Sequence, residues 1–147
     1  MYLFSQFIYS FLSTVGFSIL FNVPKSSIVY AGITGGIGWT LYIYINNLVF
    51  SVTFSSFIAS IVVAILGEVF ARIDKKPVTA FVIPGIVPLV PGYGMYLTMI
   101  NLINDSFDTA IKIGVNAIFT GGAIAIGIIL VSSVAKIIKS MKNPLFK

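Results

Sequence analysis

The sequence contains no cysteine and no histidine, and only four of its 147 residues are acidic. Without cysteine the chain has no disulfide, no thiol nucleophile and no thiolate ligand for a metal. Without histidine it lacks the side chain that most often serves as a general acid, a general base or a metal ligand near pH 7. Four carboxylates are too few for an independent catalytic site, so we expect no enzyme activity, no metal site and no cofactor.

Charge is scarce throughout the chain. Only 9% of the residues are charged and 58% are hydrophobic, whereas roughly a quarter of the residues of a soluble domain are charged. The hydrocarbon core of a bilayer is about 30 Å thick, and a helix needs about 20 apolar residues to cross it. The composition therefore predicts an all-α integral membrane protein with about five transmembrane helices, which form a single transmembrane domain over residues 1–147.

Apolar segments separated by short polar breaks give the positions of these helices. We expect spans at about residues 2–21, 27–45, 49–70, 78–103 and 110–137. Pro24 and Lys25 follow the first span, and Asn46-Asn47 is the expected turn between the second and the third. No basic segment precedes the first span, which is long enough to cross the bilayer, so we interpret it as a retained helix rather than a signal peptide.

The basic residues lie between the spans and at the C-terminus, so the net charge of +5 does not indicate a nucleic-acid surface. With the N-terminus outside, Lys112 is the one basic residue near the outer side. The other eight then lie inside: Lys25, Arg72, Lys75, Lys76, Lys136, Lys139, Lys142 and Lys147. The positive-inside rule predicts a multi-pass protein of the inner membrane with a cytoplasmic C-terminus. It also favours a complete but broken fourth span over a re-entrant hairpin.

The fourth span is interrupted near its middle, and hence near the bilayer midplane, by Pro84, Gly85, Pro88, Pro91, Gly92 and Gly94. Each proline removes a backbone donor, and in hydrocarbon an unsatisfied backbone group costs several kcal/mol by rough estimate. Transporters use broken helices at this depth to bind substrate. We therefore predict a substrate path formed by these six residues together with Tyr93, Tyr96 and Thr98. The alternative is a proline-kinked helix that serves only packing.

Polar residues inside the other spans are weaker candidates. Gln6, Ser10, Thr14, Ser18 and Asn22 recur every four residues, on one side of the first helix. They line either an aqueous path or an interhelical contact, and Asn22 is the most site-like of them. Asn116 in the last span is a further candidate for the path.

Glu68 is the one carboxylate inside an apolar run. An ionisable group in a membrane span is a candidate proton or ion site, but an ion pair with Arg72, one turn away, explains it equally well. Small residues spaced for close helix approach occur at Gly32 and Gly36, and again at Ala117, Gly121 and Ala125. We interpret those as packing positions.

Residues 21–24 after the first span, residues 35–38 in the second and residues 77–94 before an acidic loop resemble the threonine/serine exporter family. The chain is similar to the split form of that family, in which a small five-span protein works with a larger subunit. Residues 83–92 are the most specific part of the resemblance. Short loops with few charged residues depart from many relatives and leave the partner contacts undefined.

The resemblance implies export of threonine and serine, or of C4-dicarboxylates such as succinate. It also implies a partner that carries five further spans and a cytoplasmic domain, with the two five-span halves forming an inverted repeat. The positions that match the family are Asn22, Pro24, Pro84, Gly85, Pro88, Pro91 and Gly92.

We therefore expect a membrane subunit of a secondary exporter of small hydrophilic metabolites, acting in the lipid bilayer as part of a hetero-oligomer. The alternative is a passive channel-forming or scaffolding membrane subunit without its own substrate site.

Overall fold

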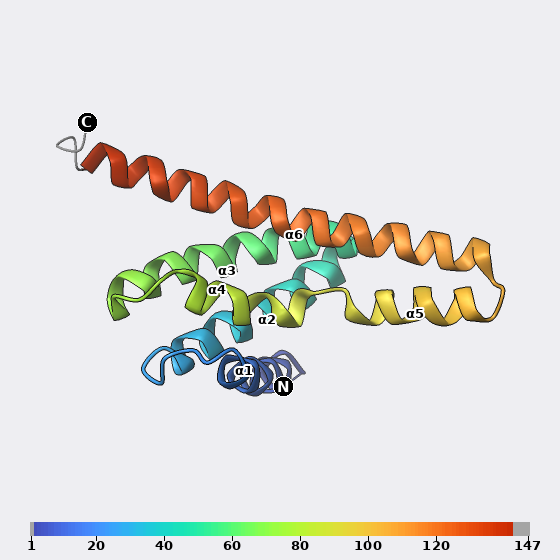
Figure 1. The fold of residues 1–147 in the computed structure, drawn as a ribbon, viewed down its shortest axis with the longest axis horizontal. Coiled ribbons are helices and arrows are strands. Elements are labelled where there is room, and N and C mark those ends of the chain that lie inside the picture. The colour runs from blue at the N-terminus through green and yellow to red at the C-terminus, as the bar shows by residue number, and fades with distance from the viewer. Residues whose placement is uncertain (1, 143–147) are drawn as a thin grey trace.

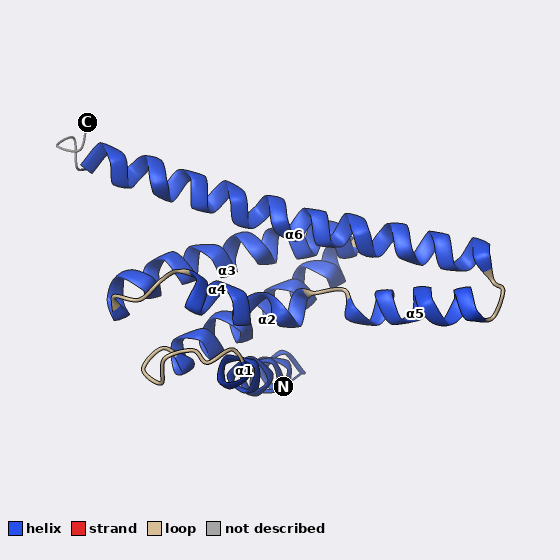
Figure 2. Cartoon of the chain, in the orientation of Figure 1, coloured by secondary structure: helices blue, strands red, loops and turns tan. Residues whose placement is uncertain are grey.

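The structure of the chain, a computed structural model, describes residues 2–142, and within them it contains helices and no strands (Figures 1 and 2). The elements are α1 (Tyr2–Leu20), α2 (Ile28–Val49), α3 (Val52–Asp74), α4 (Thr79–Ile86), the short 3-10 helix η1 (Val87–Leu89), α5 (Gly92–Ile103) and α6 (Phe107–Lys142). The predicted all-α class is confirmed. Lys147, which belongs to the predicted basic tail, lies outside the described residues.

Four of these helices, α1, α2, α3 and α6, are each long and apolar enough to cross a membrane. The pair formed by α4–η1 and α5 meets the same test when it is taken together, with a bend of 49° between its two parts. A bend of this size leaves α5 running onward from α4, whereas a re-entrant hairpin would turn back (Figure 1). Within residues 2–142 the structure thus has four helices that could cross a membrane, or five when the bent pair is counted as one broken span.

The turn between the second and third spans is not where the sequence indicated. Asn46 and Asn47 lie within α2, and the chain reverses at Phe50, which is left-handed with φ 54° and donates its N–H to the Asn46 carbonyl. The Ser51 side chain then caps α3 by accepting from the Phe54 amide at 3.4 Å. The prediction was wrong, because the two asparagines stay helical in the last turn of α2 and the helix ends only at Phe50.

Other boundaries also move. The third span ends at Asp74 rather than at residue 70. Lys75, with φ 52°, caps this end of the helix, two residues before Pro77. The last helix runs from Phe107 to Lys142 instead of over residues 110–137. At 1.5 Å per residue its 36 residues extend about 54 Å, well beyond the hydrocarbon core.

Small residues let α1 and α2 approach each other closely. An added Cβ at Gly32 would lie 2.7 Å from the Phe11 ring, and one at Gly36 would lie 2.6 Å from the Phe7 ring. The Ser10 hydroxyl donates to the Gly35 carbonyl at 2.9 Å. The predicted packing role of Gly32 and Gly36 is therefore confirmed.

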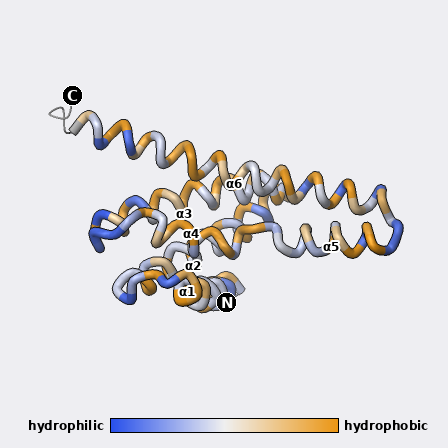
Figure 3. Tube along the Cα trace, viewed as in Figure 1, coloured by the Kyte–Doolittle hydropathy of each residue, from blue (hydrophilic) through white to orange (hydrophobic). Residues whose placement is uncertain are grey.

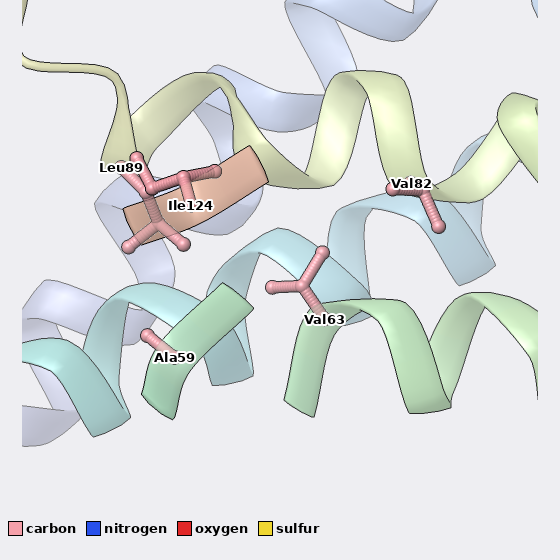
Figure 4. Close-up of a cluster of buried hydrophobic side chains, with 5 residues drawn as sticks. All are labelled: Ala59, Val63, Val82, Leu89 and Ile124. Carbon is pink, nitrogen blue, oxygen red and sulfur yellow. The ribbon is translucent and has the colours of Figure 1, made fainter. Parts of the chain in front are cut away.

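A compact apolar cluster connects α3, α4 and η1 to α6. Ala59 and Val63 of α3, Val82 of α4, Leu89 of η1 and Ile124 of α6 are buried together (Figure 4). Helices α1, α2 and α3 all contact α4 and η1, so these three helices enclose the first half of the broken span.

The second half of the broken span has a different environment. Helix α5 packs against the first part of α6, and none of its residues is buried. Figure 1 shows these two segments extending together beyond the α2–α3 connection. Hydrophilic residues collect at the α1–α2 and α3–α4 connections, at the α5–α6 turn and toward the end of α6 (Figure 3).

Candidate functional site

The interruption of the fourth span is confined to a few residues between η1 and α5. Val90 is extended, with φ −60° and ψ 131°, as expected for a residue that precedes a proline. Its amide donates to the Val87 carbonyl at 3.2 Å, and the Gly92 amide donates to the Val90 carbonyl at 2.8 Å. Pro91, with φ −76° and ψ 52°, occupies the N-cap position of α5. Pro91 is thus the proline that sets the break.

Helix α5 begins at this break without a side-chain cap. The first amides of a helix have no carbonyl one turn earlier to bind. Here the Met95 amide reaches Pro91 at 3.0 Å and the Gly92 amide reaches Val90. The amides of Tyr93 and Gly94 are the remaining donors of the first turn, at the positive end of the helix dipole. This end of α5 is suited to an anionic group such as a carboxylate.

A groove of about 400 Å³ lies beside the break, between α5 and α6. Its walls are mostly apolar, and its lining residues are Val90, Pro91, Met95, Thr98, Gly114, Ala117, Ile118 and Gly121. Glycine makes the two helices fit closely, since a Cβ at Gly114 would lie 3.0 Å from the Thr98 methyl group and one at Gly94 would lie 3.6 Å from Ala117. The Thr98 hydroxyl donates to the Gly94 carbonyl at 2.8 Å.

The predicted site residues divide into those near this groove and those away from it. Pro91 and Thr98 line the groove, and Gly94 lies in the same α5–α6 contact. Gly92, Tyr93 and Tyr96 are exposed on α5, and Asn116 is exposed on α6. The structure thus brings Pro91, Gly94 and Thr98 together at the groove and leaves the other four residues on the exposed surface.

The part of the predicted path that precedes Val90 is enclosed in the bundle. Pro84 is buried inside α4, which continues to Ile86. The predicted interruption of the helix at Pro84 is therefore wrong. The backbone keeps helical angles there and gives up the one donor that proline lacks. Gly85 packs against Thr34 and Val63, and Pro88 is half-buried. These residues thus lie in the packed part of the span that precedes the break.

Asn22 lies apart from the break. It is exposed in the loop after α1, with φ 53°. That loop contacts the end of α3, where Ser26 and Ser27 donate to Asp74, at the opposite end of α4 from Val90. On α1, Ser10, Thr14 and Ser18 make packing contacts rather than lining a path, because they are buried and hydrogen-bond to backbone carbonyls.

Glu68 pairs with Arg72 across one helical turn at 3.7 Å. The arrangement is the ion pair that the sequence left open as an explanation of this carboxylate. Its role as a proton or ion site stays a prediction. Within residues 2–142 no group of acidic side chains is arranged to hold a metal ion.

Sequence reasoning missed a polar cluster where α3 faces its neighbours. Ser55, Ser56 and Ser60 are buried on α3, and Thr53 hydrogen-bonds to Thr120 of α6 at 3.3 Å. Among the described residues, the Ser56 hydroxyl and the Asn46 side-chain oxygen are buried without a hydrogen-bond partner. The recurrence of serine along α3 was the available signal.

Comparison with known proteins gives matches to a family model and to curated proteins. The model of a family described as "Threonine/Serine exporter, ThrE" matches residues 6–134. An uncharacterized protein of Haemophilus influenzae is 29% identical over 134 residues, which cover 84% of this chain and 44% of that protein. The chain therefore spans less than half the length of this relative. No solved structure matches the chain.

Proposed function

The chain belongs to the threonine/serine exporter family, and we propose that it is the membrane subunit of a secondary exporter of small hydrophilic metabolites. In this proposal it works with a larger partner subunit that carries five further spans and a cytoplasmic domain. The exported compounds are threonine and serine or C4-dicarboxylates such as succinate. The chain performs no covalent chemistry and uses no cofactor.

The broken fourth span is the observation that carries this proposal. Eleven residues of α4 and η1 lie on one side of the break and the twelve residues of α5 lie on the other, so the break falls at the middle of the span. A break at that depth is where transporters expose helix ends to substrate. Amino acids and dicarboxylates share a carboxylate, which the Tyr93 and Gly94 amides at the start of α5 are suited to bind.

The exposed apolar surface of α5 is an argument for a partner subunit. Large apolar side chains on this helix face away from the chain, with Tyr93 75% exposed and Met99 61% exposed. The groove beside the break is open on one side, so a second subunit would complete it. More than half of the Haemophilus influenzae relative lies outside the matched region, which is consistent with a transport unit larger than this chain.

The proline break gives a direct test of the proposal. Replacing Pro88 and Pro91 with alanine restores two backbone donors and releases Val90 from its extended conformation. We expect the helix to close across the break and efflux of labelled threonine, serine or succinate to fall to the level of cells without the exporter. The measurement is efflux normalised to the amount of protein in the membrane.

Pro84→Ala is the matched control, because Pro84 lies inside a continuous α4. We expect this variant to keep saturable efflux. Full transport by a well-inserted Pro88→Ala/Pro91→Ala variant would remove the break from the mechanism.

A second candidate is a passive channel-forming or scaffolding subunit. It is favoured by the polar residues of α1, which make packing contacts rather than lining a path. Transport through such a subunit would rise linearly with substrate concentration, or would depend on the partner's site alone. Saturation that changes in variants of the α5 N-terminus distinguishes the exporter from this alternative.

A further inference from the structure

A strongly basic pocket of about 610 Å³ lies at the end of the bundle where α3 ends and α4 begins. Helices α3 and α6 separate toward their C-terminal ends (Figure 1), and the pocket occupies the space between them. Four basic residues line it, namely Arg72 in the last turn of α3, Lys76 just after that helix, and Lys136 and Lys139 on α6. These two pairs are more than 60 residues apart in sequence and meet only in the fold.

The pocket has an excess of positive charge. Glu68 is the one acidic residue among those described that line it, and it pairs with Arg72 at 3.7 Å. That pairing leaves Lys76, Lys136 and Lys139 around the same space. Clustered cations repel one another unless an anion lies between them, so the pocket is complementary to an anionic ligand.

Two apolar grooves lead out of this pocket toward the middle of the bundle. The first, of about 420 Å³, runs between α3 and α6 past Ile65 and Val134 and shares Glu68 and Arg72 with the pocket. The second, of about 400 Å³, runs between α4 and α6 past Ile83 and Ile128 and shares Glu68 and Lys136. Beyond Glu68 and Arg72 the first groove is lined by apolar side chains alone. The second groove is apolar along α4, at Val82, Ile83 and Ile86, and has Ser132 and Lys136 on its α6 side.

We propose that this region binds an anionic phospholipid. Its phosphate lies among Lys76, Lys136 and Lys139, and its two acyl chains lie in the two grooves. The position matches the expected depth of a headgroup, because the pocket includes Lys76 and Pro77 of the α3–α4 connection, where hydrophilic residues collect (Figure 3). Basic pockets between helices at this side of a membrane are suited to such lipids. The proposal is independent of the exporter function.

The grooves favour a lipid over a soluble anion. A small phosphate or carboxylate would use the basic pocket alone and would leave the apolar parts of both grooves unfilled. The acyl chains of a bound phospholipid would cover that apolar surface, and its phosphate would neutralise the lysines. The same site then holds the ends of α3, α4 and α6 in one arrangement.

The test is lipid binding by the purified protein in detergent, measured by native mass spectrometry and by thermal stability with added lipid. We expect phosphatidylglycerol to bind saturably and to raise the melting temperature, while phosphatidylcholine does neither. Lys136→Gln/Lys139→Gln should weaken phosphatidylglycerol binding about 30-fold, because each lysine near an anionic surface contributes about a factor of five. Lys112→Gln is the matched control on the same helix, and it should bind like the parent.

Two further measurements separate the possible sources of the anion. Glycerol 3-phosphate carries the same phosphate without acyl chains, and we expect it neither to stabilise the protein nor to compete. Val134→Trp fills the α3–α6 groove from an exposed position and should weaken phosphatidylglycerol binding while the protein stays monodisperse. Equal binding of phosphatidylcholine, or full competition by glycerol 3-phosphate, would overturn the proposal.

Discussion

At the scale of single residues, the contact between α1 and α2 depends on the absence of side chains at a few positions. Gly35 lies directly against Thr14, and its carbonyl accepts the Ser10 hydroxyl. Close approach through small residues is the main source of helix association in a bilayer, where lipid is as apolar as the helices. The α1–α2 pair therefore tolerates little added volume.

Gly35→Ala is expected to destabilise the protein by about 1–3 kcal/mol, because the new methyl group would overlap Thr14 in a packed contact. The check is the melting temperature of the purified variant in detergent. Gly122→Ala is the matched control, since no atom lies within 4 Å of its added Cβ. Equal melting temperatures for the two variants would contradict the close contact.

The candidate site shows what residue types alone do and do not predict. Proline and glycine content located the break, and the Val90 conformation follows from Pro91. The sequence did not separate Gly85, which packs against α2, from Gly94, which lies beside the groove. That distinction depends on which face of the helix meets a neighbour, which is decided by tertiary packing.

At the scale of elements, hydropathy predicted the helices, and local chemistry decided where they end. The sequence predicted the α2–α3 turn at Asn46-Asn47, because asparagine is common in turns. In the structure the turn is at Phe50. Phe50 adopts φ 54° and is 88% exposed. A left-handed conformation costs a residue with a Cβ about 1–2 kcal/mol, so this turn is locally strained.

Phe50→Gly is expected to be more stable than Phe50→Ala by about 1 kcal/mol, because glycine adopts the left-handed region without steric cost. Both variants lose the aromatic ring, so their difference isolates the backbone. Thermal unfolding in one detergent measures it. A melting temperature for Phe50→Ala at or above that of Phe50→Gly would show that the turn has another conformation.

Small-residue spacing in α6 was a partial guide to packing. Ala117 is buried, but nothing lies within 4 Å of an added Cβ at Gly121, and Ala125 is exposed. The closest approaches of α6 instead occur at Gly114 against Thr98 and at Gly127 against Ser60. A spacing rule identifies residues that permit contact, and the length and direction of α6 determine which of them make it.

At the scale of the whole molecule, the account requires a five-span topology with the basic loops on one side. The α1–α2 and α3–α4 connections, which contain Lys25 and Lys76, lie at one end of the bundle, and the α5–α6 turn, which contains Asp105, lies at the other (Figure 1). From the charge distribution, the positive-inside rule predicts that the end with Lys25 and Lys76 faces the cytoplasm. The basic pocket was not predicted, because it joins residues 72–76 to residues 136–139 and neither segment alone indicates a site.

The absence of cysteine makes this topology easy to test. In whole cells, a membrane-impermeant maleimide should label Asp105→Cys. It should label Lys25→Cys only after the cells are opened. The cysteine-free parent is the control for background. Labelling of Lys25→Cys from outside, with Asp105→Cys protected, would invert the proposed orientation.

The most direct test of the central claim is efflux of labelled threonine, serine and succinate from cells that lack their native exporters. The chain is expressed alone and then together with a larger family member that supplies the other five spans. The account predicts saturable efflux of at least one of these compounds only when both chains are present. Absence of efflux despite confirmed insertion of both chains would contradict it, and would favour a packing role for the broken helix.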